Sequence, residues 1–165
     1  MKNHRTKAFF VLITMLVMSS ISVASADVYV LDYSAVDDGE IRYGGSTQYT
    51  TAQDHSFDLW NDLGEVDILP DTTLTVEDLN YGDYYDEDDG MVGYYQYYPL
   101  IRDEIRFNEY YFDSYTSSNK KMAASHELGH ALGLDHSNSN NIMCEYVTSR
   151  TTLGVDDIDS YNYLY

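Results

Sequence analysis

The sequence of 165 residues has a single cysteine, Cys144, so no disulfide bond can form within one chain. A protein without disulfides depends for its stability on its hydrophobic core and on any metal that it binds. Basic residues are scarce as well, with nine lysines and arginines against 28 acidic residues and a formal net charge of −19. Such acidity argues against nucleic acid and anionic membranes as partners, because like charges repel, and it favours solubility or divalent cations.

Long apolar runs are almost absent. The one near the N-terminus, Ala8 to Met18, is much shorter than the roughly 20 residues that a membrane-spanning helix needs. It follows a basic start and precedes Ala24-Ser25-Ala26, a small-residue site of the kind at which signal peptides are cut. We therefore interpret residues 1–26 as a signal peptide rather than a membrane anchor, and we expect a secreted, extracellular mature chain that begins near Asp27.

The sequence does have a compact group of histidines. His126 and His130 are four residues apart, so on a helix their side chains lie on one face, one turn apart. Two imidazoles at that spacing can bind one Zn²⁺ ion, and a left-handed turn at Gly133 would bring His136 back as a third ligand. Three protein ligands and one open position are typical of a catalytic zinc. Glu127 follows the first ligand, where its carboxylate can act as a general base on water without binding the metal.

These residues match H-E-x-x-H-x-x-G-x-x-H, and the sequence resembles the metzincin clan of zinc endopeptidases. The segment Ser139 to Met143 is similar to the Met-turn of that clan. Three further features resemble the matrixin branch: Ser137 after the third histidine, the strand-like Ile105 to Asn108, and the C-terminal stretch Leu153 to Tyr165. The resemblance extends from about Glu40 to the C-terminus.

The resemblance implies an α+β fold in which residues 27–165 form one zinc metalloprotease catalytic domain. The expected parts are a twisted, mostly parallel sheet, two long helices, a Met-turn and a C-terminal helix, with the zinc above a smaller irregular lower part. The edge strand, Gly93 to Tyr98, would hold an extended peptide by strand addition. Glu127 would take a proton from the attacking water and give it to the leaving amine, and residues 145–152 would shape the specificity pocket.

The sequence also departs from the matrixin pattern. Where matrixins have histidines for a second, structural zinc, this chain has Tyr81 and Tyr95, and neutral tyrosine is a poor zinc ligand. We therefore expect one catalytic Zn²⁺ ion. The acidic stretch Asp83 to Asp89 has two interpretations, a Ca²⁺ site or a solvated loop, and its spacing differs from that of an EF-hand loop.

Hydrophobic periodicity predicts the surrounding elements. A helix is expected over Thr50 to Leu63, and a second helix, which carries the histidines, would be capped by Ser117 or Ser118. Strands are expected over 40–43, 66–76 with an interruption at Pro70, 93–98 and 101–107, the last with Ile101, Ile105 and Phe107 on one face. We interpret His55 as a surface or partly buried helix residue and Cys144 as a small buried one.

Taken together, these features predict a secreted zinc endopeptidase, a monomer that acts on protein or peptide substrates. Two alternatives stay open: a zinc hydrolase of another amide bond, such as one in the cell wall, and a catalytically silent binding protein with the same fold. Glu127 argues against the silent protein, because a pure binder does not need a general base. Substrate tests alone separate the two kinds of hydrolase.

Overall fold

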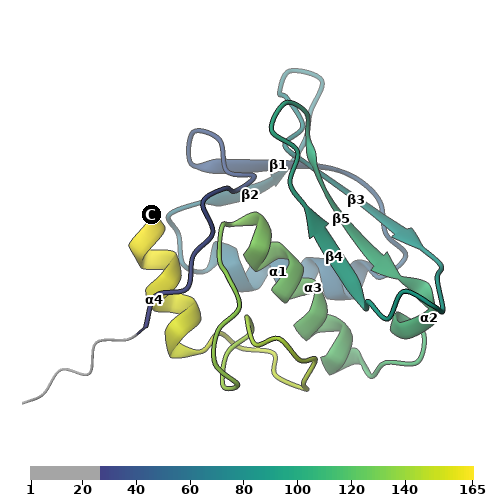
Figure 1. The fold of residues 1–165 in the computed structure, drawn as a ribbon. Helices are drawn as coiled ribbons and strands as arrows, with labels where there is room; N and C mark the ends of the chain where they lie inside the picture. Colours follow the sequence, from purple (N-terminus) through teal and green to yellow (C-terminus); the bar gives the residue numbers. More distant parts are fainter. Residues whose placement is uncertain (1–26) are drawn as a thin grey trace, which may run out of the picture.

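The computed structural model describes residues 27–165, so the predicted signal peptide, residues 1–26, lies outside the described part of the chain. The elements in chain order are β1 (Glu40–Gly45), α1 (Thr50–Asn61), β2 (Asp67–Pro70), β3 (Leu79–Tyr84), β4 (Gly93–Gln96), β5 (Asp103–Asn108), α2 (Glu109–Phe112), α3 (Ser117–Ala131) and α4 (Val155–Leu164). Figure 1 shows one sheet above α1 and α3, with α4 at one side. Within residues 27–165, no helix is both long and apolar enough to cross a membrane.

The five strands form one sheet in the order β2-β1-β3-β5-β4. All neighbouring pairs are parallel except β4 and β5, which are antiparallel. This mostly parallel sheet confirms the predicted α+β class. The strand β4 lies at the edge of the sheet, so one side of its backbone has no neighbouring strand.

The core lies between the sheet and the two long helices. Alternate residues of the strands point toward the helices, and Ile41, Leu79, Ile105 and Phe107 are fully buried there. The helices α1 and α3 pack against each other, and the Trp60 indole N–H donates to the Ser125 carbonyl at 2.9 Å. The long helices are thereby held in a fixed position below the sheet.

The two ends of the described chain lie beside the C-terminal end of α3. The N-terminal segment is bound there by its backbone, because Leu31 N–H donates to the Gly133 carbonyl and Ala35 N–H to the Ala131 carbonyl, both at 2.8 Å. On α4, Ser160 Oγ accepts a hydrogen bond from the Tyr29 N–H at 2.9 Å. These contacts support the turn that follows α3.

Several predicted boundaries are wrong, each for a local reason. The strand predicted over 66–76 ends at Pro70, because Asp71, Thr72 and Thr75 close a turn with side-chain hydrogen bonds. The strand predicted to start at Ile101 starts at Asp103 instead, where the Asp103 carboxylate accepts a hydrogen bond from the Tyr98 N–H and closes the preceding loop. Ile101 therefore does not share the buried face of Ile105 and Phe107.

Other differences are smaller. The helix predicted to reach Leu63 ends at Asn61, although Gly64 does take a left-handed φ of 85° just beyond it. The histidine-bearing helix is capped by Thr116, whose hydroxyl accepts the Asn119 N–H, rather than by Ser117 or Ser118. The central strand β3 was not predicted at all. Cys144 is buried, as expected.

Candidate metal centre

Two of the three predicted ligands lie on α3. The helix begins at the Thr116 cap and buries Met122, Leu128 and Ala131 against the core, which leaves His126 and His130 on the face toward the cleft. It ends at Ala131 with Leu132 as the C-cap, and Gly133 follows with a φ of 87°, a left-handed conformation that suits glycine. The chain reverses at this turn and returns toward the histidines.

The returning segment is fixed by the N-terminal part of the chain. Val30 and Leu134 form an antiparallel bridge, and the Asp135 N–H donates to the Tyr29 carbonyl at 3.0 Å. The Asp135 carboxylate then accepts a hydrogen bond from the His136 N–H at 2.7 Å. These bonds set the position from which His136 faces the helix.

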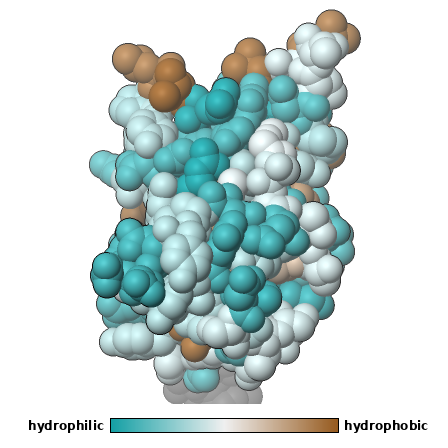
Figure 2. Space-filling model, turned by 90° about the vertical axis from the view of Figure 1, so that its right-hand side faces the viewer, coloured by the Kyte–Doolittle hydropathy of each residue, from teal (hydrophilic) through white to brown (hydrophobic). Residues whose placement is uncertain are grey.

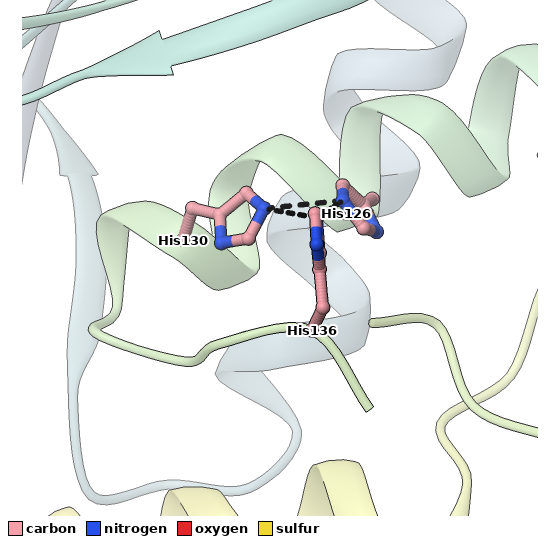
Figure 3. A group of neighbouring side chains, drawn as sticks. All are labelled: His126, His130 and His136. Carbon is pink, nitrogen blue, oxygen red and sulfur yellow. Dashed lines mark hydrogen bonds between the residues drawn. The ribbon is translucent and has the colours of Figure 1, made fainter. Parts of the chain in front are cut away.

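The three imidazoles converge as predicted. His130 Nε2 lies 3.1 Å from His126 Nε2 and 3.2 Å from His136 Nε2, and the third pair is also 3.2 Å apart. Figure 3 shows the two helix side chains and the loop side chain pointing toward one another. Tetrahedral zinc with Zn–N bonds of about 2.0–2.1 Å separates two ligand nitrogens by roughly 3.3–3.4 Å, close to this triangle.

Hydrogen bonds at Nδ1 determine which ring nitrogen of the two helix histidines carries the proton. His126 Nδ1 lies 2.9 Å from the Ile142 carbonyl and His130 Nδ1 lies 2.8 Å from the Leu134 carbonyl. A carbonyl only accepts, so each Nδ1 carries the proton and each Nε2 presents a lone pair. Facing lone pairs repel, and a cation between them removes the repulsion. The residues present therefore fit a bound zinc ion.

Burial favours the neutral, metal-binding form of these side chains. It lowers the pKa of His126 to about 3, and the neighbouring His130 contributes to the shift. Burial also lowers the pKa of His130. At neutral pH both rings are thus ready to bind metal without losing a proton.

Glu127 lies beside the histidines at the wall of a cleft of about 380 Å³. The cleft is lined by the edge strand and the segment before it, by α3, and by the chain after Met143; among its residues are Met91, Gly93, Tyr95, Met122, His136, Cys144, Glu145 and Val147. Burial raises the pKa of Glu127 to about 8, and the Tyr95 backbone N–H partly offsets the rise. A carboxylate with such a pKa can accept a proton near neutral pH and hold it.

The chain below the histidines is anchored to α4. Met143 is buried against α3 at Gly129, and its carbonyl accepts the Ser137 N–H at 2.8 Å. The Asp157 carboxylate accepts the backbone N–H groups of Ile142 at 2.7 Å and of Met143 at 3.0 Å. Since the Ile142 carbonyl orients His126, Asp157 indirectly positions a predicted metal ligand.

Other residues singled out in the sequence lie apart from the triangle. His55 is partly buried on α1, with Nε2 3.1 Å from the Thr151 carbonyl. Tyr81 is buried in the core, and the Tyr95 hydroxyl donates to Asp103 at 2.5 Å. Within residues 27–165, the histidine triangle is the group of His, Cys, Asp and Glu side chains that is arranged to hold a metal.

The acidic stretch is largely engaged with donors of the protein. Asp83 accepts hydrogen bonds from Thr47 and from the Gln48 N–H, and Asp89 accepts them from Tyr84 and Asn108. Both interpretations of this stretch, a Ca²⁺ site and a solvated loop, stay open.

The sequence did not indicate Asp157 or the cleft residues Met91 and Met122. Asp157 lies in the C-terminal stretch Leu153 to Tyr165 that resembles the matrixin branch, but its partners lie 14 and 15 positions away in the sequence. No short-range sequence pattern indicates such a contact. An acidic residue in the first turn of a helix is the one local signal, because it suits the helix dipole.

An α+β protein with three histidines converging beside a carboxylate in a cleft next to an edge strand has the architecture of a metallopeptidase. The chain belongs to the matrixin family of peptidases, whose profile matches residues 24–165. This membership identifies it as a matrixin-like metzincin and supports its assignment as a metalloprotease.

A curated relative and a solved structure are also similar. The chain is 34% identical over 130 residues to the macrophage metalloelastase of Rattus norvegicus, an alignment that covers 67% of this chain and 27% of that protein. The chain thus spans little more than a quarter of the length of this relative. The structure titled "GM1 bound form of the ECX AB5 holotoxin" has a TM-score of 0.56 and 13% identity over 84% of this chain and 86% of that chain. At that identity the likeness concerns the fold alone.

Proposed function

We propose that residues 27–165 form the catalytic domain of a zinc-dependent endopeptidase with His126, His130 and His136 as metal ligands and Glu127 as general base. The observation that carries the proposal is the triangle of Nε2 atoms beside the buried Glu127 in a cleft along an edge strand. Each part has a separate task in peptide hydrolysis.

The edge strand β4 would bind and orient the substrate. Its backbone has a strand neighbour on one side only, and Gly93 and Tyr95 line the cleft on the other. An extended peptide can pair with backbone N–H and C=O groups on this open side of the strand, which aligns a scissile carbonyl between the strand and α3. The chain after Met143 closes the cleft, and Cys144, Glu145 and Val147 would contact the substrate side chain next to the scissile bond.

Glu127 would move the proton. Its carboxylate takes a proton from the attacking water and returns it to the leaving nitrogen, and the raised pKa keeps the protonated form stable between the two transfers. A zinc ion held by the histidines would supply the Lewis acid that polarises the carbonyl and activates water. The buried segment Ile142-Met143, which we propose is the Met-turn, supports the histidines from below.

We also propose that the protein is secreted and acts as a monomer on protein or peptide substrates. The basic and apolar pattern of residues 1–26 supports export, and the scarcity of basic residues argues against nucleic acid as a partner. N-terminal sequencing of protein recovered from the medium should find a start at or near Asp27. A start at Met1 would contradict the export proposal.

Digestion of a peptide library tests the activity. The zinc-loaded mature chain should cleave internal peptide bonds, a chelator should abolish cleavage, and added zinc should restore it. Asp159→Asn, a substitution of a partly exposed residue of α4 outside the cleft, is the matched control and should keep full activity. Failure of the zinc-loaded chain to cut any peptide, while it opens an amide bond of the cell wall, would favour the other hydrolase. Absence of both activities would favour a binding protein.

A further inference from the structure

Two loops carry large apolar side chains that are mostly exposed. Leu74 and Val76, between β2 and β3, are 94% and 82% exposed. Leu100 and Ile101, between β4 and β5, are 95% and 69% exposed. We call residues 72–76 and 97–101 the apolar tips. Contact with water at such side chains is unfavourable, so a concentration of them on a folded surface indicates a partner.

The two tips project from the same end of the sheet. The strands that follow them, β3 and β5, are parallel neighbours whose first residues, Leu79 and Asp103, are paired. The bases of the loops are joined by the Asp103 N–H, which donates to the Asp78 carbonyl at 2.7 Å, and by the ion pair between Arg102 and Glu77 at 3.4 Å. Figure 1 shows both loops extending beyond the sheet in one direction. The tips are therefore a paired feature of the fold.

The surface between the tips is polar. A depression separates them, and Glu77, Arg102 and Asp103 line it together with Val76 and Ile101. Figure 2 shows the hydrophobic side chains at the top of the molecule on separate protrusions with hydrophilic surface between them. A protein partner would have to fill this depression and remove water from the Arg102–Glu77 pair, which is unfavourable. A bilayer interface can accept separate apolar side chains while hydrated headgroups solvate the charges between them.

The composition of the tips fits a lipid surface without net charge. Neither tip contains a charged residue, in a chain that has 28 acidic residues. The second tip begins with Tyr97 and Tyr98, and Arg102 follows it. Both residue types favour the membrane–water interface. The acidic remainder of the protein would be repelled by anionic lipids. We propose that the apolar tips dock the protein on zwitterionic lipid bilayers by inserting Leu74, Val76, Leu100 and Ile101 into the interface.

Docking in this way leaves the cleft open. Gly93, which is next to Glu127, pairs with Phe107, whereas the tip follows the opposite end of the same strands at Gln96 and Asp103. The four residue-to-residue steps from Asp103 to Phe107 correspond to roughly 13 Å of strand. The docked enzyme would therefore keep its cleft accessible to substrates near the lipid surface.

Flotation with vesicles of phosphatidylcholine tests the proposal on the zinc-loaded mature chain. The wild type should float with the vesicles, and the combined variant L74S/V76S/L100S/I101S should bind at least tenfold more weakly. The matched control is V155S/Y163S, because Val155 and Tyr163 are 69% and 68% exposed on α4, away from the tips. The control should bind like the wild type, and phosphatidylserine in the vesicles should weaken binding at low salt.

Both variants change exposed side chains, so we expect each to be folded. A melting temperature equal to that of the wild type checks this. Cleavage of a short peptide should stay within twofold of wild type, which separates this proposal from the proposed activity. Failure of the wild type to float, or an equal loss in the control variant, would overturn lipid docking. Two other results for the tip variant would also overturn lipid docking. A change in the oligomeric state alone would show that the tips bind a second copy of the chain. A change in the cleavage of long proteins alone would show that they bind a substrate.

Discussion

The Asp157 carboxylate, on α4, accepts a hydrogen bond from the backbone N–H of Met143 at 3.0 Å. The same carboxylate accepts the N–H groups of Ile142 and Gly154, both at 2.7 Å. One side chain thus joins the C-terminal helix to the buried segment below the histidines. It is 1% exposed, so water cannot replace it as an acceptor.

Replacement of this carboxylate should be strongly destabilising. Asp157→Ala leaves three N–H groups without their acceptor, and each unsatisfied buried group costs about 1–3 kcal/mol. We expect the free energy of unfolding to fall by at least about 3 kcal/mol in urea titrations. Asp159→Ala, a partly exposed change two residues further along α4, should have little effect. Similar stabilities of the two variants would contradict the anchoring role.

A substitution that usually stabilises a helix should have the opposite effect at Gly129. In an exposed helix, Gly→Ala gains about 1 kcal/mol. At this position the added methyl group would meet the Met143 thioether and would lie 3.0 Å from the Trp60 ring, inside the core. Gly129→Ala should therefore lower the melting temperature. An increase would show that Met143 can move away at little cost.

The partly buried His126 should give the metal-free protein a specific pH dependence. Burial lowers the pKa of His126 from 6.5 to about 3, so below pH 6.5 the unfolded chain takes up a proton that the folded chain does not. Stability is therefore lost as the pH falls. Relative to His126→Gln, the wild type should lose about 2 kcal/mol between pH 7.5 and pH 5, measured by unfolding in a chelator. A difference that is independent of pH would contradict the neutral state of this ring in the folded protein.

The metal content should be one zinc ion per chain. The triangle supplies three nitrogen ligands, whereas Tyr81 is buried in the core and Tyr95 is bonded to Asp103. Elemental analysis of the dialysed mature protein measures the ratio, and His130→Ala should contain almost no zinc. Two zinc ions per wild-type chain would reveal a second ligand set. Calcium in the same sample would support binding by the acidic loop.

The parts of the fold with a strong local pattern were predictable from the sequence. The α1 helix, the β1 strand and the histidine spacing each follow from residues that are close together in the chain. Gly133 was predictable as the turn because a left-handed φ suits glycine. The three-histidine geometry needed only this turn and the helix period.

The parts that depend on distant contacts were not predictable. The β3 strand is central, yet Gly82 and Asp83 interrupt its pattern, and its pairing with β1 and β5 decides its conformation. Ile101 has the periodicity of a strand residue, but a loop closed by Asp103 leaves it exposed. Asp157 finds its partners only after α4 has packed against the rest of the protein.

The most direct test of the account compares zinc content and peptide hydrolysis in Glu127→Gln and His130→Ala. Glu127 is proposed to move a proton without binding metal, so Glu127→Gln should keep one zinc ion and lose at least about 10²-fold in turnover. His130→Ala should lose both zinc and activity, because it removes a ligand. A Glu127→Gln protein that keeps its zinc and a substantial share of wild-type turnover would contradict the proposed mechanism.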